Sequence, residues 1–304
     1  MYTEPRPGDP VIDIRGLTKT HGQRSGPSGH TLVLDNLDLT LPAGVHALLG
    51  PNGAGKSTLV KILSTLLPFD SGTVRVLGMD PVSDRRRLQP RISLTGQFAA
   101  VDDKLSCIEN LEMMGELFGL GQRTARTRGM ELLDRFDLAT SRDVRATALS
   151  GGMRRKLDIA VGLISSPELV FLDEPTTGLD TRSRQVLWDE IRTLAREGTS
   201  VLLTTQYLEE ADALADQIRV LHGGRIVAGG TADKLKSLVG GAVISITDEV
   251  SNVVENVPTT GFVDDLAVRF AEIADRHPQA TATIARPTLD DVFLQLTRKD
   301  DLTS

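Results

Sequence analysis

The sequence has few aromatic residues and almost no cysteine: one cysteine, one tryptophan and two tyrosines among 304 residues. Because Cys107 is the only cysteine, no disulfide can form within the chain, which is typical of a reducing compartment. No apolar run approaches the roughly 18 residues that a membrane-spanning helix needs, and residues 1–7 lack the apolar stretch of a signal peptide. We therefore expect a cytoplasmic protein that contacts the membrane only through a partner.

Excess positive charge is also lacking, since 41 acidic residues outnumber 34 Lys and Arg and the formal net charge is −7. Nonspecific binding to nucleic acid depends on positive surface, so we expect no nucleic-acid partner. Hydrophobic residues at 40% and charged residues at 25% are typical of a globular protein with a sizeable core. The length allows one large domain or two.

A glycine-rich loop is the strongest signal that the chain does contain. Residues 50–57 read GPNGAGKS, which matches the G-x-x-x-x-G-K-[ST] pattern of a phosphate-binding loop. Residues 45–49 predict a buried strand before the loop, and residues 56–67 predict an amphipathic helix after it. Loop N–H groups and the helix N-terminus bind phosphate, Lys56 reaches the β- and γ-phosphates, and Ser57 ligates Mg²⁺. The nucleotide-binding residues expected here are Gly50, Pro51, Asn52, Gly53, Ala54, Gly55, Lys56, Ser57 and Thr58.

Two adjacent carboxylates follow another apolar stretch, residues 169–172. Asp173 ends this predicted strand, where a carboxylate can hold Mg²⁺ directly or through water. Glu174 comes next and projects differently, so it can orient or deprotonate an attacking water. We predict that Asp173 is a metal ligand and that Glu174 is the catalytic base.

A third motif, LSGG at residues 149–152, precedes a predicted helix at residues 154–164. Ser150 is a good N-cap, and its hydroxyl forms a second anion site with the N–H groups of Gly151 and Gly152. A chain with one complete phosphate loop and a separate phosphate-binding surface suggests a shared site. We expect two copies to meet head to tail, each completing the ATP pocket of the other.

Composition divides the chain into three parts. Residues 1–10 are polar and rich in proline, which predicts a flexible N-terminus. Residues 11–238 alternate strands with helices, which predicts an α/β domain with a largely parallel sheet, and a helical subdomain is inserted at about residues 98–165. Residues 239–304 predict a small α+β appendage, which could regulate the protein, dimerise it or contact a partner.

The set and order of these motifs resemble the ATP-binding subunit of an ABC transporter over residues 11 to about 235. The resemblance implies a P-loop NTPase core, ATP and Mg²⁺ as ligands, and ATP hydrolysis coupled to transport. It implies four further roles: Gln97 contacts the γ-phosphate and Mg²⁺, Asp180 belongs to the D-loop, Gln206 is the switch residue, and His21 stacks on adenine.

Two of these positions depart from the family pattern. Most ABC ATPases have histidine at the switch, whereas Gln206 can hydrogen-bond a γ-phosphate but cannot carry a proton. The adenine-stacking residue is usually tyrosine, and the smaller ring of His21 leaves the selectivity for ATP over GTP open.

Residues 202–212 and 288–294 resemble those of daunorubicin-resistance-type drug-export ATPases. This narrower resemblance implies a homodimer on the inner face of the cell membrane, a separate integral membrane permease, and an amphipathic drug or antibiotic as cargo. We further expect residues 97–118 to dock the permease, because they lie between Gln97 and Ser150 and nucleotide state can move them as a body. Other interpretations stay open: a soluble ABC-type ATPase acting on a ribosome or nucleic-acid complex, a nucleotide-responsive regulator with little hydrolysis, or a subunit for import, lipid export or polysaccharide export.

Overall fold

The computed structural model describes residues 9–21, 31–96, 101–238, 241–247, 253–278, 280–285 and 287–293. Residue contacts divide the chain into two compact units, 1–229 and 230–304, each described here by itself. This division falls before the short helix α8 (Ala232–Ser237), whereas the sequence pattern places the boundary after it, at residue 238. Of the N-terminus expected to be flexible, residues 1–8 lie outside the described residues.

The first unit is built on a six-stranded sheet with the strand order β5-β6-β7-β3-β8-β9. The first five strands in this order pair in parallel, as the alternation of strands and helices predicts. Every residue of β3, β6 and β7 is buried, because helices or a second sheet cover both faces. The bounds are β3 Val45–Leu49, β5 Ile92–Thr95, β6 Leu169–Asp173, β7 Ser200–Thr205, β8 Gln217–His222 and β9 Arg225–Gly230.

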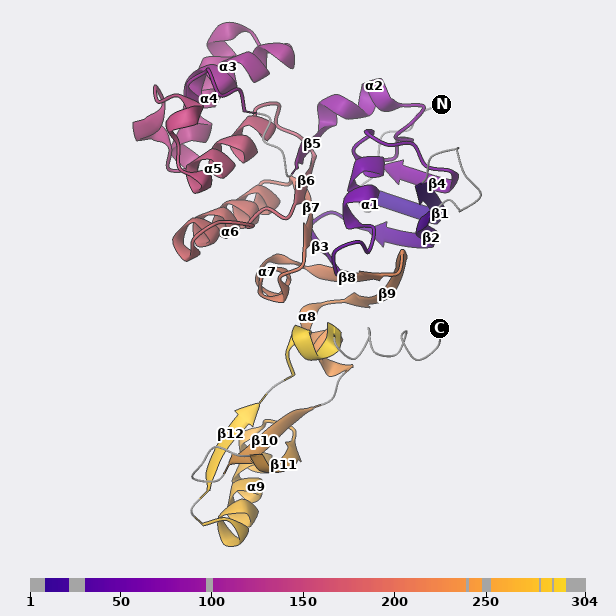
Figure 1. Ribbon diagram of the computed structural model, residues 1–304, viewed down its shortest axis with the longest axis vertical. Coiled ribbons are helices and arrows are strands. Elements are labelled where there is room, and N and C mark those ends of the chain that lie inside the picture. Colours follow the sequence, from indigo (N-terminus) through magenta and orange to yellow (C-terminus); the bar gives the residue numbers. More distant parts are fainter. Residues whose placement is uncertain are drawn as a thin grey trace. The chain divides into compact units, whose positions relative to one another are not determined.

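A second, antiparallel sheet has the order β2-β1-β4, with β1 Ile12–His21, β2 Thr31–Leu41 and β4 Ser71–Val76. The sequence predicts only the first residues of β1, but pairing with β2 continues the strand to His21. Helix α1 (Lys56–Leu63) lies between the two sheets (Figure 1). Side chains from α1 and from both sheets form one buried cluster, which fixes the start of α1 at the carboxyl end of β3.

Three helices form the predicted helical subdomain: α3 (Cys107–Leu117), α4 (Gln122–Arg135) and α5 (Gly151–Gly162). They pack on one another beside β5 (Figure 1). Ser106 and Glu109 form a reciprocal capping box that starts α3. The remaining helical elements are α2 Arg85–Leu88, α6 Thr181–Arg196, α7 Leu208–Leu214 and the 3₁₀ turns η1 Gln89–Arg91, η2 Ala139–Ser141 and η3 Ala146–Ala148.

The second unit contains α8 and an antiparallel sheet of order β11-β10-β12, with α9 (Val263–Arg276) packed on β11. The strands are β10 Ala242–Thr247, β11 Val253–Thr259 and β12 Thr281–Ala285. The sequence pattern does not predict β11, because polar residues and Pro258 interrupt its apolar alternation. The last described residues, 289–293, are helical.

None of the helices in the described ranges is long and apolar enough to cross a membrane.

Candidate nucleotide-binding site

The phosphate loop connects β3 to α1 and is held by close backbone contacts. A Cβ atom on Gly50 would lie 2.3 Å from the carbonyl oxygen of Leu221 in β8. Gly55 has a φ of +106°, and a Cβ there would meet Leu34 at 2.8 Å and the carbonyl oxygen of Val33 at 2.9 Å. Glycine is therefore required at both ends of the loop. Gly55 provides no side-chain cap for α1, so the helix N-terminus can bind an anion.

Lys56 is 5% exposed, and its Nζ donates to the carbonyl oxygens of Gly50 (2.6 Å) and Pro51 (3.1 Å). Burial lowers the pKa of Lys56, while the nearby carboxylates of Glu174 and Asp173 raise it. The ammonium group is thus held over the loop by weak acceptors that phosphate oxygens can replace.

Asp173 ends β6 opposite Thr204 in β7, and its carboxylate is buried. The Ser57 hydroxyl donates to Asp173 Oδ1 at 3.3 Å, and the Thr204 hydroxyl donates to the same oxygen. The described residues contain no group of three or more His, Cys, Asp or Glu placed to hold a metal. Two protein oxygens nevertheless suit Mg²⁺, which takes its other ligands from water and phosphate.

Glu174 has a left-handed backbone with φ +49°, a conformation that costs a non-glycine residue about 1–3 kcal/mol. Its N–H donates to both the carbonyl oxygen (3.1 Å) and the hydroxyl (3.2 Å) of Thr204, which stabilise this turn. The sharp turn separates the two adjacent carboxylates: Asp173 accepts from Ser57, whereas Glu174 lines the cavity above the loop.

A cavity of about 400 Å³ joins these groups. It is lined by His21, Val33, Pro51, Asn52, Gly53, Gly55, Lys56, Ser57, Thr58 and Glu174. His21 is the exposed last residue of β1. The two residues before His21 are Lys19 and Thr20, and the Asp70 carboxylate accepts hydrogen bonds from the Lys19 ammonium (2.8 Å) and the Thr20 N–H (2.6 Å). These bonds hold the end of β1 at the cavity.

Three further expected residues do not line this cavity. Ser150 caps α5, accepting from the N–H of Met153 at 3.2 Å. Asp180 caps α6, accepting from the N–H of Ser183 at 2.7 Å, and this bond lowers the pKa of Asp180. Gln206 is exposed and follows β7 directly, at the same sheet edge as Asp173.

Of the other expected residues, Gly151 is exposed beside Ser150, and Gly152 lies against the Ser183 side chain, neither of them in the cavity lining. Gly50 and Ala54 are buried behind the loop surface. Gln97 lies outside the described residues.

A family model described as "ABC transporter" matches residues 34–177. The chain is 46% identical to the daunorubicin resistance ATP-binding protein DrrA3 of Streptomyces coeruleorubidus, over 96% of this chain and 97% of the relative. The chain belongs to the ABC transporter family. Another relative of this ABC ATPase is the daunorubicin/doxorubicin resistance ATP-binding protein DrrA of Streptomyces peucetius, 51% identical over 78% of this chain and 70% of the relative.

Solved structures of ABC ATPases share this fold. An ATP-binding subunit of an ABC transporter superposes with a TM-score of 0.66 and 25% identity, covering 75% of this chain and 92% of that one. A dimeric post-hydrolysis ATP-binding cassette bound to ADP and Pi has the same TM-score at 22% identity, covering 72% and 98%. The P-loop NTPase fold predicted from the motifs is confirmed.

The ABC ATPase has a residue at this site that sequence reasoning missed, Arg155 in α5. Its guanidinium donates to the carbonyl oxygens of Gly96 (2.6 Å), Asp173 (3.1 Å) and Pro175 (3.1 Å). These bonds tie the helix that begins at the LSGG motif to both ends of the Asp173–Pro175 turn. No local pattern distinguishes Arg155 from its neighbour Arg154, so only the tertiary structure identifies it.

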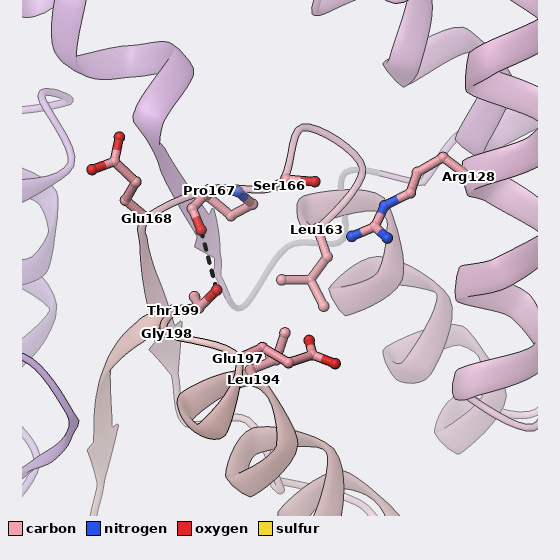
Figure 2. Close-up of a pocket in the computed structure, with 9 residues that line it drawn as sticks. All are labelled: Arg128, Leu163, Ser166, Pro167, Glu168, Leu194, Glu197, Gly198 and Thr199. Carbon is pink, nitrogen blue, oxygen red and sulfur yellow. Dashed lines mark hydrogen bonds between the residues drawn. The ribbon is translucent and has the colours of Figure 1, made fainter.

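A second cavity of the ABC ATPase, about 310 Å³, lies at the opposite ends of β6 and β7 (Figure 2). Its two acidic residues have partners: Glu168 pairs with Arg91, and Glu197 pairs with Arg135 at 3.1 Å. The hydroxyl of Thr199 donates to the Pro167 carbonyl at 3.3 Å, as Figure 2 shows. These interactions stabilise the loops that lead into β6 and β7.

Proposed function

We propose that this ABC ATPase is the ATP-binding and ATP-hydrolysing subunit of an exporter that moves an amphipathic drug or antibiotic through a separate membrane permease. The observation that carries the proposal is the cavity in which the phosphate loop, Lys56 and Glu174 meet beside the Ser57–Asp173 pair. The cargo class rests on the drug-resistance names of relatives that are 46–51% identical.

In the proposed reaction, loop N–H groups and Lys56 bind the β- and γ-phosphates of ATP. Mg²⁺, held by Ser57 and Asp173, would neutralise negative charge on the phosphates. Glu174 takes a proton from water, the water oxygen bonds to the γ-phosphorus, and the bond to the β–γ bridging oxygen breaks, which releases ADP and phosphate. Gln206 and Gln97 hydrogen-bond the γ-phosphate in this scheme.

We assign the remaining residues to a head-to-tail homodimer. Ser150, Gly151, Gly152 and Asp180 do not line the cavity of their own chain, which supports the idea that they complete the pocket of a partner copy. His21, at the cavity rim, stacks on the adenine ring.

The membrane partner is proposed to bind the segment from residue 97 to 118. Leu117 and Phe118 at the end of α3 are 74% and 42% exposed, and such large apolar side chains suit a protein interface. The subunit would act in the cytoplasm, on the inner face of the cell membrane. We propose no ribosome or nucleic-acid function, because no described observation favours one over the export function.

Replacing Glu174 with glutamine tests the hydrolytic role, because the amide keeps the shape and cannot accept the proton. We expect ATP turnover to fall by at least about a hundredfold, the scale of general-base catalysis, while ATP binding is retained and an ATP-bound dimer accumulates on size exclusion. Glu168→Gln, at the other end of β6, is the matched control and should keep parental turnover. Normal hydrolysis by Glu174→Gln would remove Glu174 from this role.

The export role is tested in drug-sensitive cells that express the ATPase together with a candidate membrane permease. Resistance should require both proteins and disappear with Glu174→Gln. Resistance conferred by the membrane protein alone would contradict the proposal.

A further inference from the structure

Glu210 in α7 carries a buried carboxyl group that the proposed reaction does not use. The residue is 1% exposed, and neither carboxylate oxygen has a hydrogen-bond partner among the described residues. Native proteins rarely leave a buried acidic group without hydrogen bonds, because removing its charge from water is costly. Such a group calls for an explanation, and those near functional motifs are candidates for a role in activity.

Three potential donors lie near this carboxyl group, although neither of its oxygens has a hydrogen bond that meets geometric criteria within the described residues. Burial raises the pKa of Glu210, whereas the hydroxyls of Thr205 and Thr176 and the indole N–H of Trp188 lower it. The Trp188 Nε1 is itself buried and has no hydrogen-bond partner in the described part of the chain. The Thr205 hydroxyl instead donates to the Tyr207 carbonyl oxygen at 3.4 Å. The Glu210 carboxyl group and the Trp188 indole N–H thus lie close together without meeting hydrogen-bond criteria, so small shifts of their backbones would make or break hydrogen bonds.

Each of these neighbours belongs to a different segment of the nucleotide site. Thr205 ends β7 and directly precedes Gln206, and its hydroxyl accepts from the Tyr207 N–H at 2.9 Å. Thr176 lies two residues after Glu174 in the turn that leads to the D-loop. Trp188 lies in α6, the helix capped by Asp180. The Glu210 carboxyl group is therefore the point at which the three segments meet.

Two arginines place positive charge near the same carboxyl group. Arg184 of α6 lowers the pKa of Glu210, and Arg155 interacts with it electrostatically from α5. Arg155 also donates to the carbonyl oxygens on both sides of Glu174. The contacts of Glu210 thus extend to the backbone that positions the proposed catalytic base.

We infer that Glu210 is a positioning residue for ATP hydrolysis. When nucleotide is bound, its carboxyl group forms hydrogen bonds with Thr176, Thr205 and Trp188. These bonds keep the segment that carries Gln206 aligned with the segment that carries Glu174. The inference rests on the proposed roles of Glu174 and Gln206. It gives α7 a specific part in the reaction, because α7 begins two residues after Gln206 and carries the carboxyl group on its buried face.

Glu210→Met tests this inference, since methionine fills a similar volume and removes the hydrogen bonds. The kcat for ATP should fall about tenfold, the effect of losing one hydrogen bond made in the transition state, while KM changes by less than about twofold. Glu210→Gln keeps hydrogen-bonding atoms and should retain most of the parental kcat. Glu209→Met is the matched control, because Glu209 is the adjacent residue and its side chain is 75% exposed.

Trp188 provides a second readout, because it is the only tryptophan of the chain. Adding Mg²⁺ and a nonhydrolysable ATP analogue should shift the Trp188 emission in the parent and in Glu209→Met, but not in Glu210→Met. Should Glu210→Met fail to fold, Thr176→Val removes one of the facing hydroxyls and should lower kcat with KM retained.

Parental kcat together with a parental emission shift in the foldable variants would show that Glu210 is only a buried structural group. Glu174→Gln separates the two proposals. If this variant hydrolyses ATP normally, the proposed function is wrong. If Glu174→Gln loses turnover while Glu210→Met stays fully active, only the positioning role of Glu210 is overturned.

Discussion

Replacing Arg155 with methionine should destabilise the first unit and slow hydrolysis together. The guanidinium donates to four carbonyl oxygens and lies 3.3 Å from the buried carboxylate of Asp158, and its side chain is only 14% exposed. A hydrogen bond to a charged group contributes about 1.5–3 kcal/mol, and breaking a buried ion pair costs about 3–5 kcal/mol. These contributions overlap, so we expect a loss of about 3–5 kcal/mol in the free energy of unfolding.

Urea denaturation followed by Trp188 fluorescence measures this loss, because the only tryptophan is buried in the first unit. Arg155→Lys keeps the charge but not the planar set of donors, so its free energy of unfolding should lie between those of the parent and Arg155→Met. Arg154→Met is the matched control: Arg154 is on the same helix, is 31% exposed and pairs with Asp103 at the surface. This control should change stability by less than about 1 kcal/mol.

The same variants test whether Arg155 positions the catalytic turn. Its bonds to the carbonyl oxygens of Asp173 and Pro175 flank Glu174, so kcat should fall in Arg155→Met even at temperatures where the protein is fully folded. If the free energy of unfolding of Arg155→Met is within about 1 kcal/mol of the parental value and its rate of ATP hydrolysis is parental, other groups hold this turn and the reasoning is refuted.

Three further outcomes are expected. In steady-state assays with saturating Mg-ATP, Gln206→Ala should reduce hydrolysis about tenfold to a hundredfold. Gln206→His should retain hydrolysis and gain a pH dependence near pH 6–7. Unchanged activity of the alanine variant would rule out Gln206 as the switch residue. Mixing Lys56→Ala with Ser150→Arg should restore part of the activity, because a mixed dimer has one intact shared site, whereas inert mixtures would favour a site within one chain. Lys19 and Thr20 lower the pKa of Asp70 from 3.8 to about 2, so its carboxylate stabilises the folded state above pH 3.8 and loses that effect as the pH falls through 2. Asp70→Asn should therefore lower the free energy of unfolding by about 1 kcal/mol at neutral pH, after allowance for the exposure of Asp70. In urea titrations the stabilities of parent and variant should converge near pH 2. A difference that does not depend on pH would contradict this.

The sequence by itself determined the parts of this protein whose chemistry lies in contiguous residues. The phosphate loop needs glycine, lysine and serine at fixed spacing between a strand and a helix, and residues 45–67 carry all of these signals together. Asp173 ends a strand whose other residues are all apolar, and Glu174 follows it, so their place at the carboxyl end of a buried strand also follows from local order. The alternation of apolar strands and helices likewise predicted the parallel sheet, because each strand must be covered on both faces.

Only the tertiary structure decided which distant residues meet at that site. Thr204 is an ordinary strand threonine until the register of β6 and β7 sets it against Asp173. Arg155 and Glu210 are single charged residues on helices, and packing alone brings one to the Asp173 carbonyl oxygen and the other to Trp188. The physical reason is that a local pattern encodes which face of an element is buried, whereas the partner of a buried polar group depends on how elements far apart in the chain pack together.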